Sequence, residues 1–129
     1  MLSPAQPPSS GVVLVVEDDS DVLNAIASIL EDAGYQVLRA ANGVEALDAL
    51  GDRNGECDLI LLDLLMPVMH GWEFRQKQKQ TPAFADIPVV LMSAGAHMAA
   101  VSGELDAAGY LTKPVDMNDL LGVASRYSS

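Results

Sequence analysis

Short apolar runs alternate with segments of helical periodicity along most of the chain. The runs are rich in Val, Ile and Leu and stop at polar or turn-forming residues, which is typical of strands buried on both faces of a sheet. Between them, apolar residues recur every three or four positions, as in Val22, Ile26 and Ile29, the spacing of an amphipathic helix. The pattern predicts strands at residues 12–16, 35–39, 58–63, 87–92 and 110–112, and helices at residues 20–33, 43–50, 71–80, 96–108 and 116–126.

This alternation predicts an α/β fold. Strands separated by helices of about ten residues form βαβ units with right-handed crossovers, which give a parallel sheet covered by helices on both faces. We therefore expect a flavodoxin-like, doubly wound, five-stranded parallel sheet with five helices. The strand order 2-1-3-4-5 places the first and third strands side by side at the switch point, where ligands bind.

The length of 129 residues, half of them hydrophobic, fits a single domain. We expect this domain to cover residues 11–127. Residues 1–10 are rich in Pro and Ser and are predicted to be a disordered tail or linker remnant, and residues 128–129 a C-terminal tail.

Net charge and cysteine content indicate which binding partners and which cellular compartment to expect. The 18 acidic against 7 basic residues give a net charge of -11, which argues against direct nucleic acid binding and favours protein partners. The single Cys57 excludes an internal disulfide and fits a reducing compartment. No apolar run approaches the roughly 20 residues of a membrane span, and the N-terminus lacks the features of a signal peptide. We expect a cytoplasmic protein without a membrane partner.

Three of the predicted strands end abruptly on charged residues. Glu17 and Asp18 follow the first strand, Asp63 ends the third, and Lys113 follows the fifth. Because the carboxyl ends of parallel strands share one edge of the sheet, these side chains should converge. Three acids in one place repel one another unless a cation lies among them, and carboxylate oxygens suit Mg²⁺. Beside such an ion, Asp63 could act as a nucleophile toward phosphorus.

Other residues near the same edge are candidates either for the site or for local structure. Ser93 follows the fourth strand, where its hydroxyl could donate to a phosphoryl oxygen or merely cap a turn. Leu65 has the right offset to offer a backbone carbonyl to the metal, and Pro114 is a candidate for a cis peptide bond. Asp19 and Asp21 already lie in the first helical turn, where acids favour the positive end of the helix dipole.

Together these motifs resemble the receiver domain of bacterial two-component response regulators, over about residues 11–127. No single motif is specific, but their order and spacing match the family. The resemblance rests on Val16-Glu-Asp-Asp19, Asp63-Leu-Leu-Met-Pro67 with Gly71, Ser93-Ala94, Tyr110 and Lys113-Pro114.

The resemblance implies a phosphoacceptor and a metal site. Asp63 would take a phosphoryl group from the phosphohistidine of a sensor histidine kinase or a histidine phosphotransfer protein. Asp18 and Asp63 would ligate Mg²⁺ directly, Glu17 through water, and Leu65 through its carbonyl. By the same resemblance the chain is a phosphoacceptor switch that promotes its own phosphorylation and dephosphorylation, not an enzyme acting on a separate substrate.

The resemblance also implies how the signal leaves the site. Ser93 matches the switch hydroxyl, Lys113 the phosphate-contacting lysine, and Tyr110 the aromatic that changes rotamer when the hydroxyl moves. This two-state element would alter a face that binds a downstream protein or, after phosphorylation, forms a homodimer. Candidate residues for the face are Met98, Val101, Leu105, Met117 and Leu120, although helical Met and Leu side chains more often belong to a core.

Several alternatives compete with this interpretation. A phosphohydrolase of the haloacid dehalogenase type needs a second acid where Leu65 stands, and a flavin carrier needs phosphate-binding donors where residues 17–19 are acidic. A receiver-like interaction module that works without phosphorylation stays open, as does the receiver part of a larger hybrid kinase or regulator. His70 stands where the family commonly has an acid or asparagine, with an undefined effect on the loop.

Overall fold

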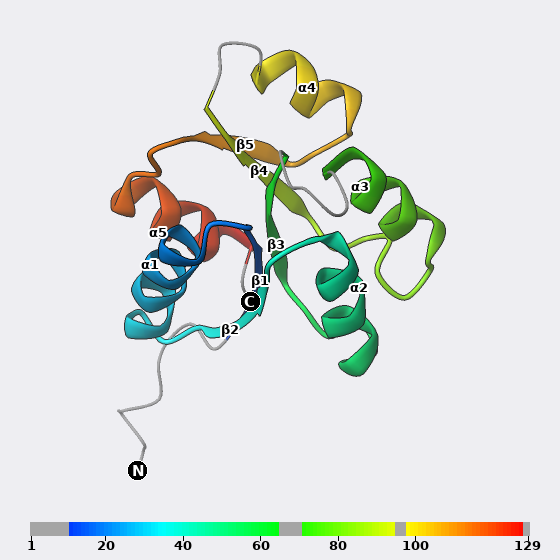
Figure 1. Cartoon of the computed structure of the whole chain (residues 1–129), viewed down its shortest axis with the longest axis horizontal. Helices are drawn as coiled ribbons and strands as arrows, with labels where there is room; N and C mark the ends of the chain where they lie inside the picture. The colour runs from blue at the N-terminus through cyan, green and yellow to red at the C-terminus, as the bar shows by residue number, and fades with distance from the viewer. Residues whose placement is uncertain (1–10, 65–70, 95–97, 128–129) are drawn as a thin grey trace.

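The structure is a computed structural model that describes residues 11–64, 71–94 and 98–127. Five parallel strands form one sheet in the order β2-β1-β3-β4-β5 between two layers of helices (Figure 1). The predicted fold class and strand order are confirmed. The elements are β1 (Val12–Val16), α1 (Ser20–Asp32), β2 (Gln36–Ala40), α2 (Gly43–Asp52), β3 (Leu59–Asp63), α3 (Gly71–Gln80), β4 (Val89–Ser93), α4 (Met98–Glu104), β5 (Gly109–Thr112) and α5 (Met117–Tyr127).

Two hydrophobic cores lie on opposite faces of the sheet. One joins the strands to α2, α3 and α4 through residues such as Leu50 and Phe74, and the other joins them to α1 and α5 through residues such as Leu30 and Leu120. Neighbouring residues of a strand point to opposite faces, so a strand covered on both sides must be apolar at nearly every position. This requirement explains the continuous apolar run of β3, where all five residues are buried.

Some element boundaries differ from the predicted ones for local reasons. Because Pro88 has no N–H to donate, β4 begins at Val89 instead of the predicted residue 87. Gly34 has φ 102°, and β2 begins at Gln36 instead of residue 35. α4 stops at Glu104, well before the predicted residue 108, and Asp106 has a left-handed φ of 53°.

The first turn of α1 is closed by Asp19. Its side chain accepts hydrogen bonds from the backbone N–H groups of Asp21 and Val22 at 3.0 and 3.2 Å, as an N-cap residue does. The assignment of Asp19 to the helix start is therefore confirmed, and Glu17 and Asp18 are left as the acids of the strand end.

Several predictions fall on residues outside the described ones: the N-terminal tail at 1–10, the C-terminal tail at 128–129, the carbonyl of Leu65 and the effect of His70 on its loop. Within the described residues, no helix combines the length and the apolar character that crossing a membrane requires.

Gly55 is required by the packing of the loop between α2 and β3. Its φ is +78°, and a Cβ built there would lie 2.3 Å from the carbonyl oxygen of Ala83. We expect Gly55→Ala to lower the free energy of unfolding by about 2 kcal/mol, because it adds a left-handed alanine and a clash with backbone.

Urea unfolding of the two matched glycine variants measures this effect. Gly51→Ala is the control, because Gly51 is helical and a Cβ there meets nothing within 4 Å; it should be neutral or slightly stabilising. Equal unfolding midpoints for the two variants would contradict the packing argument.

Candidate functional site

The carboxyl ends of four strands bring the predicted site residues together. β1 pairs in parallel with β3, so Glu17, which follows β1, lies near Asp63, the last residue of β3. Ser93 ends β4, and the backbone N–H of Lys113 donates to the Ser93 carbonyl at 3.0 Å. They line a hollow of about 340 Å³ formed by Glu17, Asp18, Asp19, Asp63, Ser93, Ala94 and Lys113.

Three acids of this hollow are close enough to share one cation. Glu17 and Asp63 are 1% and 4% exposed, while Asp18 is exposed at the rim. One carboxylate oxygen from each residue lies within 4.8 Å of the other two. Acids gathered this closely gain from any nearby positive charge.

Lys113 supplies one such charge. Its Nζ atom lies 2.5 Å from Glu17 Oε1 and 3.5 Å from Asp63 Oδ2. Burial of the ammonium favours its neutral form, but the hydrogen bond and charge of Glu17, together with the charge of Asp63, outweigh that effect and raise the pKa of Lys113. The lysine therefore stays protonated at neutral pH and balances part of the acidic charge.

The donor set fits a magnesium ion. Glu17 Oε2 accepts a hydrogen bond from the Asp19 N–H at 3.2 Å. The buried Oε1 atom is ion-paired with the Lys113 ammonium, which balances only one of the three acidic charges. The remaining negative charge favours a cation, and an all-carboxylate set with an open side suits Mg²⁺, which keeps several waters. The residues present thus fit the metal that the sequence predicted.

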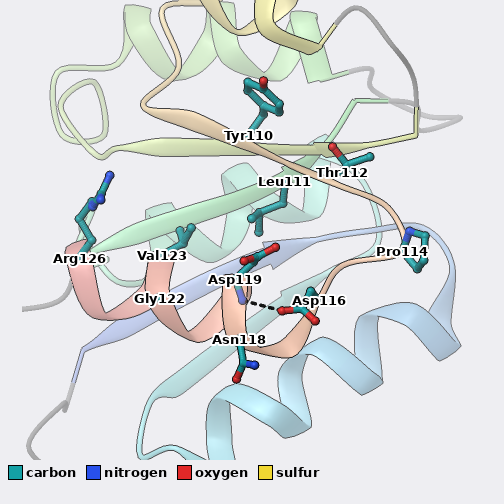
Figure 2. A pocket seen from close by; sticks show the side chains of 10 residues that line it. All are labelled: Tyr110, Leu111, Thr112, Pro114, Asp116, Asn118, Asp119, Gly122, Val123 and Arg126. Atoms are coloured by element: carbon teal, nitrogen blue, oxygen red, sulfur yellow. Dashed lines mark hydrogen bonds between the residues drawn. The ribbon is translucent and has the colours of Figure 1, made fainter.

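Ser93 and Tyr110, the two predicted switch residues, lie on neighbouring strands, at the end of β4 and in β5. Ser93 is 7% exposed, and its hydroxyl donates only a long, 3.4 Å bond to the Ala94 carbonyl, which costs little to exchange for a better acceptor. Tyr110 is 44% exposed, and Figure 2 shows its ring projecting from β5 on the side opposite Leu111. The Lys113–Pro114 peptide bond is cis, as predicted.

The predicted output face needs correction. Leu105 and Leu120 are 8% and 1% exposed and belong to the two cores, because each points from its segment toward the sheet. Val101 is partly buried against the first core, whereas Met117 is 53% exposed. The side chain of Met98 lies outside the described residues.

A polar hollow of about 510 Å³ occupies part of this face instead (Figure 2). Its walls come from β5 and α5 and include the charged side chains of Asp116, Asp119 and Arg126. Nothing in the sequence distinguishes these residues, because charged positions on a helix usually mean no more than a solvated face.

An apolar groove beside the site was also missed. It measures about 460 Å³, and it shares Ala94 and Lys113 with the acidic hollow. The α1 side chains that line the groove recur every three or four residues in the sequence, which alone does not distinguish a groove from a core contact. The groove is lined by Val22, Ala25, Ile26, Ile29, Ala94, Lys113, Pro114, Val115 and Leu120.

Comparison with known proteins agrees with this geometry. The sequence profile described as "Response regulator receiver domain" matches residues 13–125. A probable transcriptional regulator, ycf29, of Pyropia yezoensis is 37% identical over 86% of this chain and 50% of its own length. The phosphate regulon transcriptional regulatory protein PhoB of Pseudomonas aeruginosa is 35% identical over 84% of this chain and 48% of its own. The chain thus spans about half the length of these curated relatives.

Solved structures give the same result. The chemotaxis protein CheY4 of Vibrio cholerae superposes with a TM-score of 0.83 at 29% identity, covering 92% of this chain and 99% of that one. The receiver domain of a signal transduction histidine kinase from Syntrophus aciditrophicus gives 0.80 at 33% identity, covering 92% and 89%. With strand order, strand-end acids and profile in agreement, this chain belongs to the family of response regulator receiver domains.

Proposed function

We propose that the chain is a signalling switch that accepts a phosphoryl group on Asp63 in a Mg²⁺-dependent reaction. The observation that carries the proposal is the position of Asp63. Its carboxylate is 4% exposed, shares a cluster with Glu17 and Asp18, and lies 3.5 Å from the Lys113 ammonium. A nucleophilic carboxylate beside a cation site and a lysine is suited to phosphoryl transfer.

The residues divide the chemistry among them. An Asp63 oxygen forms the new bond to phosphorus as the phosphorus–nitrogen bond of the donor's phosphohistidine breaks, and the imidazole nitrogen leaves with the electron pair. Glu17, Asp18 and Asp63 would hold the Mg²⁺, which neutralises charge on the phosphoryl oxygens when bound. Lys113 adds a second positive charge. Because the same residues serve the hydrolysis of the aspartyl phosphate, the chain promotes both its own phosphorylation and its own dephosphorylation.

Phosphorylation would then move the hydroxyl and the aromatic ring. The new phosphoryl oxygens are stronger acceptors than the Ala94 carbonyl, so the Ser93 hydroxyl turns toward them. Space vacated by Ser93 favours the inward rotamer of Tyr110, which changes the exposed face of β5 and α5. The phosphoryl group thereby selects one of two arrangements of that face.

The donor of the phosphoryl group docks, in this proposal, on the apolar groove along α1. The groove and the acidic hollow share Ala94 and Lys113, so a protein that carries phosphohistidine into the hollow must cover the groove. Its matching surface is apolar, as on a helix of a sensor histidine kinase or a histidine phosphotransfer protein.

The output partner is proposed to be a protein, either a downstream target or a second copy of the phosphorylated chain. A net charge of -11 opposes contact with nucleic acid. Relatives such as the DNA-binding dual master transcriptional regulator RpaA of Synechocystis are more than twice as long as the matched region.

We propose a cytoplasmic location, since the lone Cys57 fits a reducing compartment.

Asp63→Asn is expected to abolish phosphorylation, because an amide is no nucleophile toward phosphorus and is a weaker metal ligand. Intact-protein mass after incubation with acetyl phosphate and Mg²⁺ measures it. The wild type should gain one phosphoryl group, and should not gain it in EDTA. Asp48→Asn, an exposed acid of α2, is the matched control and should be labelled normally.

Equal labelling of Asp63→Asn and the wild type would refute the nucleophile. If the folded wild type gains no mass, beryllofluoride binding distinguishes fast hydrolysis from no reaction. Failure of both would favour an interaction module that works without phosphorylation.

Lys113→Ala is expected to separate metal binding from switching. Loss of a positive charge 2.5 Å from Glu17 and 3.5 Å from Asp63 should tighten Mg²⁺ binding about three- to tenfold, measured by calorimetric titration. The Tyr110 resonance should no longer respond to beryllofluoride, which mimics the phosphoryl group. A variant whose Tyr110 still switches like the wild type would contradict the role of Lys113.

Ala25→Glu is expected to block the donor protein and spare the chemistry. It puts a charge on the exposed rim of the apolar groove, so phosphotransfer from a purified kinase that labels the wild type should slow at least about tenfold. Labelling by acetyl phosphate should be unchanged. Ser28→Glu, exposed on α1 outside the groove, is the matched control; equal slowing of both variants would contradict docking in the groove.

A further inference from the structure

Arg75 is a buried cation that the proposed chemistry does not use. It lies on α3 and is only 6% exposed. Among the described residues it forms no ion pair with a carboxylate. Burial lowers its pKa, and the nearby Asp106 opposes that shift, but a guanidinium stays charged at neutral pH. A charge kept in such a place needs hydrogen bonds that compensate for the lost water.

These hydrogen bonds go to the carboxyl end of α4. Arg75 Nε donates to the Leu105 carbonyl at 2.9 Å, and Nη2 donates to the Asp106 carbonyl at 2.7 Å. Both carbonyls directly follow the last residue of α4, Glu104. The end of a helix carries carbonyls without helical partners and a partial negative charge. The guanidinium therefore caps α4 from a neighbouring helix.

Gln78 extends the contact toward the start of β4. It is fully buried, its Oε1 accepts from Arg75 Nη1 at 2.7 Å, and its Nε2 donates to the carbonyls of Phe84 and Ile87 at 2.9 and 3.0 Å. One hydrogen-bond network thus ties the end of α4, the middle of α3 and the segment that enters β4.

The carboxyl end of α4 is held by contacts from outside the helix. The helix has seven residues, too few for stability without tertiary contacts. Its carboxyl end has the Arg75 cap and the buried side chain of Leu105. Toward its amino end, Ala100 is exposed, and a few residues connect that end to Ser93. Along the chain, the amino end of α4 is the end nearer to Ser93.

We propose that Arg75 is a positioning residue of the switch, which pins the carboxyl end of α4 to α3 so that switching moves α4 about that end. The inference rests on the proposed function. It predicts a divided response: the amino end of α4 changes on phosphorylation, while the hollow between α3 and α4, lined by Trp72, Arg75 and Glu104, keeps its shape.

Amide NMR of the full chain tests the clamp before any ligand is added. The N–H groups of Leu105, Asp106 and Ala107 donate to carbonyls of α4, so their hydrogen exchange reports on the clamped end. Exchange should accelerate about tenfold in Arg75→Met, because two bonds to carbonyls are lost. Arg75→Lys keeps the positive charge but loses the planar array of guanidinium donors, so it should accelerate exchange less. This variant replaces Arg75→Met if Arg75→Met does not fold.

Lys79→Gln is the matched control. It removes an exposed contact of 3.5 Å between Lys79 and Asp106, which joins the same two segments, together with one positive charge. Exchange at residues 105–107 should stay within about twofold of the wild type, because exposed ion pairs contribute little. Acceleration equal to that of Arg75→Lys would overturn the assignment to Arg75.

Addition of beryllofluoride and Mg²⁺ then separates the two proposals. In the wild type, the amide shifts of Ala100 and Val101 should change and those of residues 105–107 should not; in the Arg75 variants the change should spread to residue 107. A wild type that binds no beryllofluoride overturns the proposed function and this inference with it. A wild type that binds it but shifts both ends of α4 equally, or Arg75 variants that keep the wild-type pattern, overturns the clamp alone.

Discussion

Repulsion among carboxylates at one edge of the sheet is the constraint on which the site depends. Glu17 and Asp63 are almost fully buried, and Asp18 completes a cluster whose oxygens lie within 4.8 Å of one another. Lys113 compensates for only part of this charge. The cluster is therefore arranged to gain from a divalent cation.

The sheet makes this cluster possible by its strand order. β1 and β3 are neighbours, so acids that lie more than forty residues apart in the sequence meet at their carboxyl ends. The parallel register fixes these ends, because Val16, which precedes Glu17, pairs with Leu62, which precedes Asp63. The rigid cores and the charged edge are thus two results of one arrangement, and the core holds the acids together against their repulsion.

The helices contribute in two ways. α1 and α5 pack with apolar side chains and leave a groove that opens beside the site. α3 instead buries the polar side chains of Arg75 and Gln78, which satisfy backbone carbonyls of two segments, one after α4 and one before β4. Directional hydrogen bonds of this kind fix position more closely than apolar contacts do. The polar helix α3 therefore joins the end of α4 to the segment that enters β4.

The sequence by itself determined the fold class, the strand order and the strand-end acids, because buried parallel strands must be apolar on both faces and must end together. It also placed Asp19 at the start of the first helix and named Pro114 as a candidate cis proline, whereas the capping role of Asp19 came from the structure. It did not determine which apolar helical residues are core: Leu105 and Leu120 are buried, whereas Met117 is exposed. Only the tertiary structure decided that, together with the α1 groove and the Arg75 cap, because these depend on which helices become neighbours.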